Sequence, residues 1–369
     1  MSTQVLNTRT RRTAATAAKE GAKALREGRL VAFPTETVYG VGALASDRSA
    51  MRRLRDLKDR PKRPFSVHIG GPEAAERYVE PDVWARRLMS RVWPGPLTLV
   101  LPAPDPLPDA ALGDEDLRGE LVSGDWIALR CPSEPTAARM LAAVEGPVVA
   151  TSANRQGGPS PRSAADVLQA LDGDVPLLID SGPTQYGQDS TIARLAGGEL
   201  TVLRKGVYDA RHVRRLLRWR LLFVCTGNTC RSPMAAGMAK KLLADRLGCR
   251  VGELRGLGIE VRSAGLFAGR GAHATPEAVA AAEEWGADIS RHSSRPADRD
   301  LIHWADLVFC MTDVHVAEAA RIDPATDDRI RRLDGVGDVP DPIGGGPNVY
   351  RRTARHIRRA LESALKEIC

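Results

Sequence analysis

The sequence lacks several features that would each point to a particular class of protein. No apolar run approaches the length of a membrane span. Residues 1–20 contain basic side chains but no apolar core, so we expect no secretory signal there. The six cysteines show no disulfide-framework spacing, and the GxxxxGK[ST] motif of P-loop ATPases does not occur. These absences favour a cytoplasmic protein with no membrane partner, in which thiols stay reduced.

What is present fits two α/β domains. At 369 residues the chain exceeds what one hydrophobic core usually organises, and 43% apolar and 27% charged residues are ordinary values for a globular protein. In the first 208 residues, strand-like runs alternate with helical stretches such as 49–58 and 137–144, and residues 102–124 are predicted to form a surface excursion. The strand-like runs are Leu30–Phe33, Ser66–Ile69, Thr98–Leu101, Trp126–Arg130, Val148–Ala150, Leu177–Ile179 and Leu200–Leu203.

The stretch LLFVCTGNTCRSPMA in the second half carries the clearest chemical signal. An apolar run, Leu221–Val224, leads into a polar loop that begins at Cys225 and ends at Arg231, and Pro233 suits the first turn of a helix. Backbone N–H groups of such a loop converge on an anion, and the helix dipole reinforces them. We expect this field to lower the pKa of Cys225 and make it a thiolate nucleophile. A cysteine alone at a strand end is usually only a packed apolar residue, but the whole string favours phosphoryl chemistry.

The string CTGNTCRSP resembles the active-site loop of the low-molecular-weight protein-tyrosine phosphatases. The resemblance continues through SAG at 263–265, ISRHSSRP at 289–296, ADLVFCMTDVH at 305–315 and DVPDP at 338–342, and covers about residues 220–368. It implies a Rossmann-like parallel sheet flanked by helices. It also implies catalysis by Cys225, by Arg231 and by Asp341, the last as the general acid of an Asp-Pro pair. Phosphate binding and specificity would fall to the other loop residues, namely Thr226, Gly227, Asn228, Thr229, Cys230 and Ser232.

The substrate of this domain stays open between phosphoarginine and phosphotyrosine, and we favour phosphoarginine. Tyrosine phosphatases of this class usually place aromatic residues after the Asp-Pro pair, where this chain has Ile343, and a bulky apolar residue where it has Thr229. The sequence CTGNTCRS resembles that of the bacterial protein-arginine phosphatases. Arsenate reductases of the same fold relay a disulfide through two downstream cysteines; Cys310 matches one, but no second cysteine follows nearby.

In the first half, polar and basic residues cluster where strand-like runs end. PTETVYG follows the first run, RDLKDRPKRP precedes the second, and TSANRQGGPS follows another. A polyphosphate site requires the point charges of lysine, the bidentate fork of arginine and backbone N–H groups that come close to the phosphates. The residues alone therefore indicate a nucleotide or nucleic-acid site, with an ordinary basic surface loop as the simpler alternative.

Together PTETVYGVG, KDR at 58–60, WPGPLTLVL, TSAN, QDSTI and VLRKG resemble the bacterial threonylcarbamoyl-AMP synthases over about residues 18–208. The resemblance implies a twisted mixed sheet with a concave nucleotide cavity. It also implies synthesis of threonylcarbamoyl-AMP from threonine, bicarbonate and ATP, with Mg²⁺ accompanying ATP, for the modification of tRNA. Carried over, threonine would contact Thr35, His68, Arg130 and Ser190, and ATP would contact Lys58, Arg60, Ser152, Asn154, Ser160 and Arg204.

The positive charge is concentrated between the two halves. Arg204–Arg220 holds seven basic residues against one acidic, and Arg211, Arg214, Arg215 and Arg218 recur on one face of a predicted helix. This face is either solvated or a phosphate-contacting stripe for RNA.

From these observations we expect an arm at 1–17, the synthase-like domain at 18–208, a basic linker helix at 209–219 and the phosphatase-like domain at 220–369. Expected partners are tRNA-modifying proteins, tRNA itself and a phosphoprotein. The alternative is that the first domain only binds RNA. Such a module has no need of the residues that are expected to contact threonine.

Overall fold

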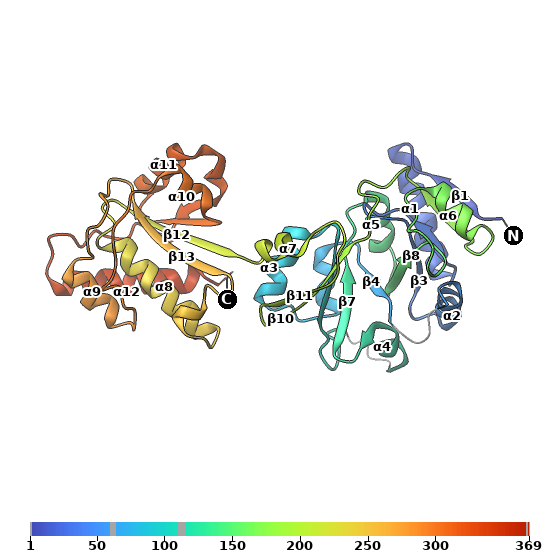
Figure 1. Ribbon diagram of the computed structural model, residues 1–369, viewed down its shortest axis with the longest axis horizontal. Helices are drawn as coiled ribbons and strands as arrows, with labels where there is room; N and C mark the ends of the chain where they lie inside the picture. Colours follow the sequence, from blue (N-terminus) through green and yellow to red (C-terminus); the bar gives the residue numbers. More distant parts are fainter. Residues whose placement is uncertain (1, 60–63, 110–114, 367, 369) are drawn as a thin grey trace. The chain divides into compact units, whose positions relative to one another are not determined.

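The computed structural model describes residues 2–59, 64–109, 115–366 and 368. They fall into two compact units, Met1–Leu217 and Arg218–Cys369 (Figure 1). Each unit has its own sheet and its own core, and each is described by itself below. Among the described residues, no helix is both long and apolar enough to cross a membrane.

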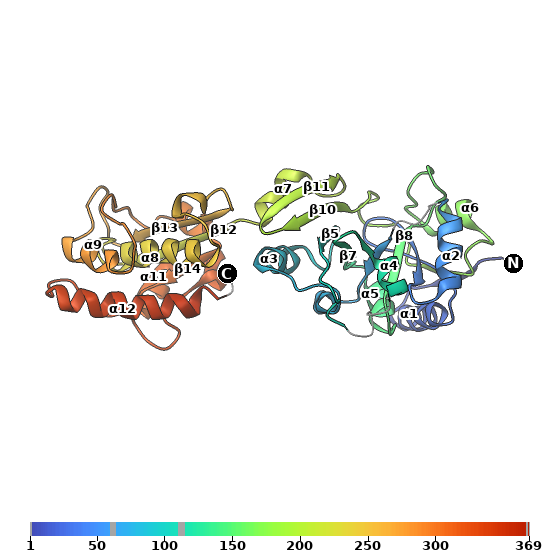
Figure 2. The same ribbon diagram turned by 90° about the horizontal axis from the view of Figure 1, so that it is seen from below.

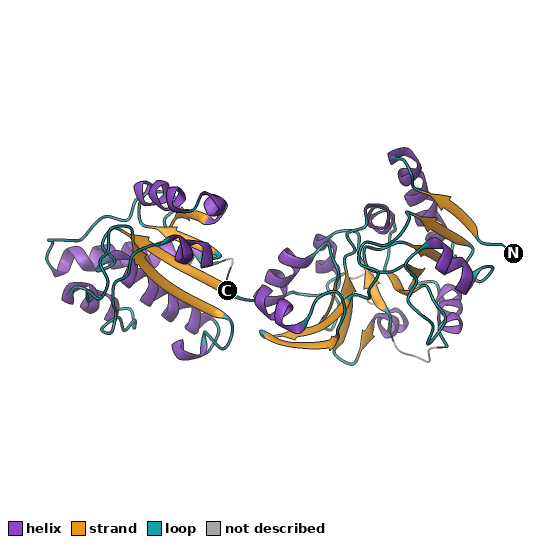
Figure 3. Ribbon diagram, turned by 45° about the horizontal axis from the view of Figure 1, so that its top comes forward, coloured by secondary structure: helices purple, strands orange, loops and turns teal. Residues whose placement is uncertain are grey.

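The first unit is built on one mixed sheet, whose strands are drawn in orange in Figure 3. Strands far apart in the chain become neighbours in it. Its order is β1-β9-β2-β3-β8-β4-β7-β5-β10-β11, and β6 pairs with β7 at the side. The β4/β7 and β5/β10 pairs are parallel, whereas β3/β8 and β5/β7 are antiparallel. The strands are β1 (Gln4–Asn7), β2 (Val31–Phe33), β3 (Gly40–Leu44), β4 (Ser66–His68), β5 (Leu97–Pro102), β6 (Val122–Ser123), β7 (Trp126–Arg130), β8 (Val148–Ser152), β9 (Leu177–Asp180), β10 (Thr191–Ala196) and β11 (Glu199–Arg204).

Helices cover this sheet and bury its apolar side chains. Helix α1 is rich in alanine and is capped by the Thr10 side chain, and it packs against α5. Leu25 from α1, Phe33 from β2, Met140 from α5 and Ile179 from β9 meet in one fully buried cluster. The helices are α1 (Arg11–Arg26), α2 (Arg48–Leu57), η1 (Pro72–Arg77), α3 (Val83–Val92), α4 (Glu115–Leu121), α5 (Pro135–Ala142), α6 (Ala164–Leu171) and α7 (Ala210–Leu216).

The predicted mixed sheet is confirmed, and all seven strand-like runs are strands. The structure differs at both ends of this unit. Residues 1–17, expected to form a flexible arm, contain β1, which pairs with β9, and the start of α1. The expected linker helix is α7, which packs on α3 of the first unit, and Arg91 there donates a hydrogen bond to the Leu216 carbonyl. Within α7, the side chain of Val213 is buried and the arginine side chains of the helix are exposed.

The second unit is a four-stranded parallel sheet with the order β13-β12-β14-β15. Helices α8 and α12 lie on one side of it and α10 and α11 on the other (Figures 1 and 2). This is the parallel sheet flanked by helices that the sequence predicted. The elements are β12 (Trp219–Cys225), α8 (Arg231–Arg246), η3 (Val251–Glu253), β13 (Ile259–Gly265), α9 (Pro276–Glu283), α10 (Arg299–Trp304), β14 (Leu307–Cys310), α11 (Asp313–Ile322), η4 (Pro324–Arg329), β15 (Ile330–Arg332) and α12 (Pro347–Ala364).

Candidate functional sites

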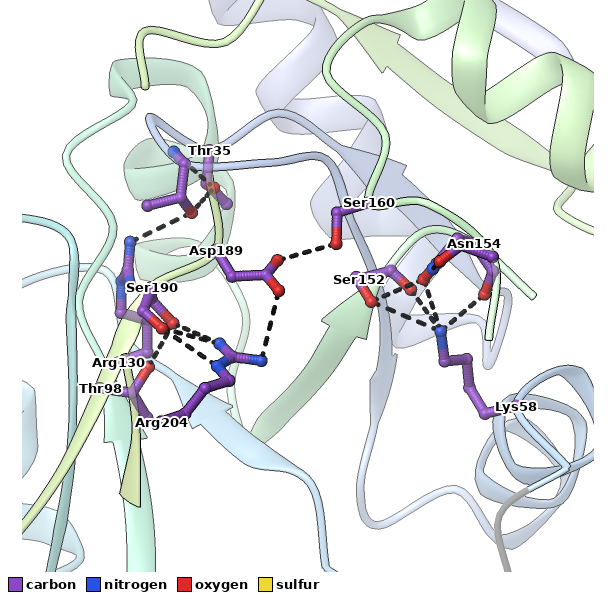
Figure 4. A network of polar contacts seen from close by, with 12 residues as sticks. Thr35, Lys58, Thr98, Arg130, Ser152, Asn154, Ser160, Asp189, Ser190 and Arg204 are labelled. Atoms are coloured by element: carbon purple, nitrogen blue, oxygen red, sulfur yellow. Dashed lines mark hydrogen bonds and ion pairs between the residues drawn. The ribbon is translucent and has the colours of Figure 1, made fainter. Parts of the chain in front are cut away.

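The first unit holds a polar cavity of about 270 Å³ on its sheet. Strands β4, β5, β7 and β8, the loop after β2 and the segment just before β10 supply its walls, so segments far apart in the chain converge there (Figure 4). Most of the residues expected to bind threonine or ATP line it, namely Thr35, His68, Arg130, Ser152, Ser190 and Arg204. The expected Arg60 lies outside the described residues.

Arg130 at the end of β7 is almost completely buried and is paired with Glu36, which is equally buried. The second Glu36 carboxylate oxygen accepts a hydrogen bond from the Ser133 backbone amide at 2.9 Å. Burial lowers the pKa of the Arg130 guanidinium, and the Glu36 charge opposes that shift. Among the described residues, Arg130 Nε is buried with no hydrogen-bond partner. One donor of the fork is therefore covered by neighbouring atoms without making a hydrogen bond.

Thr35 and His68 stand beside this pair. The Thr35 hydroxyl donates to the Val38 carbonyl at 2.7 Å and contacts the Thr37 hydroxyl at 2.8 Å, which closes the turn after β2. His68 Nδ1 lies 3.1 Å from the Ser66 carbonyl, so this nitrogen carries the proton and Nε2 is left as an acceptor. Burial and the nearby Arg130 charge lower the pKa of His68 to about 4. The imidazole is therefore neutral at physiological pH.

This shift predicts how stability depends on pH. Because the unfolded chain keeps a His68 pKa near 6.5 while the folded chain has about 4, the unfolded state binds more protons between these values. The free energy of unfolding of the first unit should therefore fall as the pH decreases from 6.5 to 4, by at most about 3 kcal/mol. Chemical denaturation at several pH values should show this slope in the wild type and a flatter one in His68→Gln. His212→Gln, in the same unit, is the control and should keep the wild-type slope.

Ser190 and Arg204 lie next to Arg130 on the other side of Thr98 (Figure 4). Arg204 Nη2 donates to the Ser190 carbonyl at 2.9 Å and to its hydroxyl at 3.0 Å, and that hydroxyl lies 2.9 Å from the Thr98 hydroxyl. Asp189 accepts a hydrogen bond from Ser160 at 2.9 Å and lies 3.7 Å from Arg204. The arginine side chain is 45% exposed, so it is held by its neighbours but remains open to a ligand.

Lys58 takes a different position from the one expected. Its ammonium group is buried and donates to the Ser152 carbonyl at 3.0 Å, to the Asn154 carbonyl at 2.6 Å and to the Asn154 side chain at 2.8 Å. The Ser152 hydroxyl donates to the same Asn154 oxygen at 2.6 Å. The sequence predicted that Lys58 contacts ATP, and this stays a prediction; in the structure its ammonium group holds the turn after β8 in shape. Asn154 and Ser160 line a second cavity of about 770 Å³ that shares Asp189 with the first.

In the second unit, Cys225 ends the central strand β12 and is 3% exposed. Its sulfur lies 2.9 Å from the Ser232 hydroxyl and accepts a hydrogen bond from the Asn228 amide at 3.3 Å. Burial raises the pKa of the Cys225 thiol, and the hydrogen bonds from Ser232 and Asn228 and the Arg231 charge act in the opposite direction. The lowered pKa expected from the sequence is thus wrong for the resting pocket, because burial outweighs these donors.

Asn228 braces the loop. It has a φ of 55°, in the left-handed region that asparagine tolerates better than most residues. Its side-chain amide donates to the Ser232 hydroxyl at 2.9 Å and to the Ser263 hydroxyl at 3.0 Å, and its side-chain oxygen accepts from the Arg295 amide. A side chain at Gly265 would meet the Thr226 carbonyl at 2.5 Å, so the neighbouring strand needs glycine there. The loop is therefore held rigidly around Cys225.

Arg231 and Asp341, expected to be catalytic, form an ion pair at 2.5 Å. The arginine also donates to the Val339 carbonyl at 3.3 Å and to the Thr226 hydroxyl at 3.3 Å. His315 of α11 reaches the same Thr226 hydroxyl at 2.9 Å, and its other nitrogen lies 2.8 Å from Thr312. Burial and the Arg231 charge lower the pKa of His315. The pocket therefore contains an imidazole that was not identified from the sequence.

Two family models match the chain. The family of Sua5, YciO and YrdC, described as "Telomere recombination", matches residues 23–206, and the low molecular weight phosphotyrosine protein phosphatase family matches residues 220–369. The threonylcarbamoyl-AMP synthase of Chromohalobacter salexigens is 37% identical, over 48% of this chain and 91% of its own length. The protein-arginine-phosphatase of Bacillus subtilis is 37% identical, over 40% of this chain and 95% of its own length. The chain belongs to both families.

Both families are families of enzymes, and the fold agrees with them. The threonylcarbamoyl-AMP synthase of Pyrococcus abyssi is 38% identical over 195 residues, which are 52% of this chain and 55% of that protein. The chain thus spans about half the length of the first curated synthases that it matches. A solved structure of a P. abyssi Sua5 variant is 26% identical, with a TM-score of 0.51, and covers 96% of this chain and 97% of its own.

Several residues that complete the two sites were not identified from the sequence. In the synthase-family domain they are Glu36, Thr98 and Asp189, and in the phosphatase-family domain they are Ser263 and His315. Glu36 lies inside the PTETVYG motif, and a carboxylate within a motif expected to bind anions was the available signal. The others also lie inside quoted motifs, but their roles come from contacts with distant segments, which local patterns do not reveal. Among the described residues, no group of three or more His, Cys, Asp or Glu side chains is placed to hold a metal ion.

Proposed function

We propose that the chain is a bifunctional enzyme that makes threonylcarbamoyl-AMP in its first domain and removes phosphate from proteins in its second. The first product would serve tRNA-modifying proteins. The observation that supports the synthase is the buried Arg130–Glu36 pair at the cavity wall, with Arg130 Nε unpartnered among the described residues. Such a donor fits the carboxylate of threonine.

The synthase reaction needs positioning and neutralised charge more than a nucleophilic side chain. The threonine amine takes up carbon dioxide derived from bicarbonate, and the resulting carbamate oxygen attacks the α-phosphate of ATP, which releases pyrophosphate. Thr35, neutral His68 and Ser190 would orient threonine beside Arg130. Arg204, 45% exposed, would face the triphosphate together with Arg60 and the Mg²⁺ that accompanies ATP. Lys58 would act by holding Ser152 and Asn154 where the nucleotide binds.

Phosphate removal would proceed through Cys225. The proton of the Cys225 thiol passes to the Asp341 carboxylate, the sulfur attacks phosphorus, the bond to the leaving group breaks, and Asp341 gives that proton to the departing atom. Water then attacks the thiophosphate, Asp341 takes its proton, and inorganic phosphate leaves. Arg231 would hold two phosphate oxygens once it exchanges its contact with Asp341 for them. The presence of all three side chains in one pocket supports this assignment.

Phosphoarginine is the proposed phosphatase substrate, because Thr229 offers a hydroxyl at the loop and the exposed Ile343 replaces a stacking ring. Thr229→Ile should shift the preference toward phosphotyrosine by roughly ten- to a hundredfold, since a hydrogen bond to a charged group is worth about 1.5–3 kcal/mol. The measurement compares kcat/KM on matched phosphoarginine and phosphotyrosine peptides. Thr226→Val, which alters a loop hydroxyl bonded to His315, should lower both activities alike. An unchanged ratio in Thr229→Ile would remove the support for arginine.

Asp341 can be tested separately. Asp341→Asn cannot donate a proton, so cleavage of an aryl phosphate with a poor leaving group should slow by roughly a hundredfold or more. An activated aryl phosphate, whose leaving group departs without a proton, should be cleaved nearly as fast as by the wild type. Equal losses on the two esters would assign the acid to another group.

A further inference from the structure

The most exposed large apolar side chains of the described residues all lie in the phosphatase-family domain. Val336 is 94% exposed, Phe267 is 77% exposed, and Val314 and Ile343 are each 69% exposed. The next in order, Leu203 of the other unit, is 51% exposed. Single exposed apolar residues need no explanation, but a group of the four most exposed ones in one domain does.

The sheet topology brings these four residues to one edge. All four strands of this sheet run parallel, so their carboxyl ends, and the segments that follow them, share one edge with the Cys225 loop. Phe267 comes two residues after β13 ends, Val314 four after β14, and Val336 four after β15. Ile343 lies further along the segment after β15. We call these four side chains the apolar rim.

Two members of the apolar rim are hydrogen-bonded to the phosphatase pocket. The Phe267 amide donates to the Thr226 carbonyl at 3.0 Å, and the Ile343 amide to the Asp341 carboxylate at 3.3 Å. The other two are near pocket residues in the chain. Val314 directly precedes His315, which contacts Thr226 at 2.9 Å, and Val336 lies three residues before Val339, whose carbonyl accepts from Arg231 at 3.3 Å. The rim residues therefore lie on the segments that border the pocket.

We propose that the apolar rim binds the protein chain of the phosphatase substrate, taking apolar side chains that flank the phosphorylated residue. The proposal rests on the proposed phosphatase function. Its occupant follows from the place of the rim on the segments that border the pocket, where a polypeptide whose phosphate reaches Cys225 would come close to these residues. The domain would thus select substrates by their flanking sequence as well as by the phosphorylated residue.

The test compares the triple variant Phe267→Ser, Val314→Ser, Val336→Ser with the wild type. Two peptides carry the same phosphorylated residue, one with leucine and valine flanks and one with serine and glycine flanks; p-nitrophenyl phosphate is the third substrate. We expect kcat/KM of the variant on the apolar-flanked peptide to fall about tenfold or more, mainly through KM. The other two substrates should change less than twofold. Val251→Ser, near the opposite edge and 42% exposed, is the matched control.

Each other outcome is informative. Equal losses on all three substrates, or no loss on the apolar-flanked peptide, would overturn the docking role. A wild-type dimer in sedimentation that becomes monomeric in the variant would instead assign the rim to a second copy of the chain. If the wild type cleaves none of the three phosphates, the proposed phosphatase fails, and that result is distinct from the failure of docking.

Discussion

Cys225→Ser is expected to abolish phosphatase activity while leaving threonine-dependent pyrophosphate release unchanged. The serine hydroxyl is a far weaker nucleophile in a buried pocket whose only compensating donors are a few hydrogen bonds and Arg231. Loss of a catalytic nucleophile reduces kcat by about 10⁴-fold or more. The two activities should separate because each unit has its own sheet and its own buried core.

Both activities are measured on the same purified protein, with phosphate release from a phosphopeptide and pyrophosphate release from ATP. Cys249→Ser, an exchange of a partly exposed cysteine in the same unit, is the control and should leave both rates as in the wild type. A fall in pyrophosphate release in Cys225→Ser would show that the two sites are coupled. Retained phosphatase activity would remove Cys225 from its assigned role.

Lys58→Ala should reduce threonine-dependent pyrophosphate release by about a hundredfold or more. The substitution removes a buried ammonium group with three hydrogen bonds to the turn after β8, so Ser152 and Asn154 lose the support that places them. Loss of one organising charged donor at a site of phosphoryl chemistry is typically worth 10²–10³ in rate. Arg60→Ala should have a comparable effect, because the family resemblance assigns it to the ATP phosphates.

Lys205→Ala, an exposed lysine of the same unit, is the matched control and should keep full activity. The phosphatase rate should be unaltered in every one of these variants. Unchanged turnover in both Lys58→Ala and Arg60→Ala would end the assignment of this segment to the nucleotide site. If Lys58 acts through the turn, Lys58→Arg should recover little activity, since a guanidinium fork does not fit three converging acceptors.

Local patterns predicted much of this fold, and the exceptions have physical causes. Runs such as Trp126–Arg130 were recognised because their residues favour strands. Strand β3 was missed because GVGAL contains two glycines, which local preference assigns to turns; β3 is a strand through its pairing with β2 and β8. Strand β1 was missed because its side chains are mostly exposed and its order comes from pairing with β9. Tertiary pairing, which local composition does not encode, decides such segments.

The same distinction applies to the sites. Some residues inside contiguous motifs, such as Cys225, Arg231 and Ser152, were found from their strings. His315 and Asp189 also lie inside quoted motifs, but their roles were not found, because these arise from contacts with Thr226 and Ser160, far away in the sequence. The partner of a charged motif residue also depends on such contacts. Arg130 was expected to hold a substrate carboxylate, and in the structure its guanidinium is already paired with the carboxylate of Glu36.

In the resting phosphatase pocket, the positive charge of Arg231 is neutralised by the negative charge of Asp341, with which it forms an ion pair. An incoming group must outcompete a carboxylate that is already in place and covalently tethered beside the arginine. A phosphate monoester with two negative charges has that advantage, whereas a singly charged diester or sulfate ester offers no more charge than the aspartate it would displace. We therefore expect the pocket to favour dianionic monoesters, and the displaced aspartate can act as the acid once it has taken up a proton.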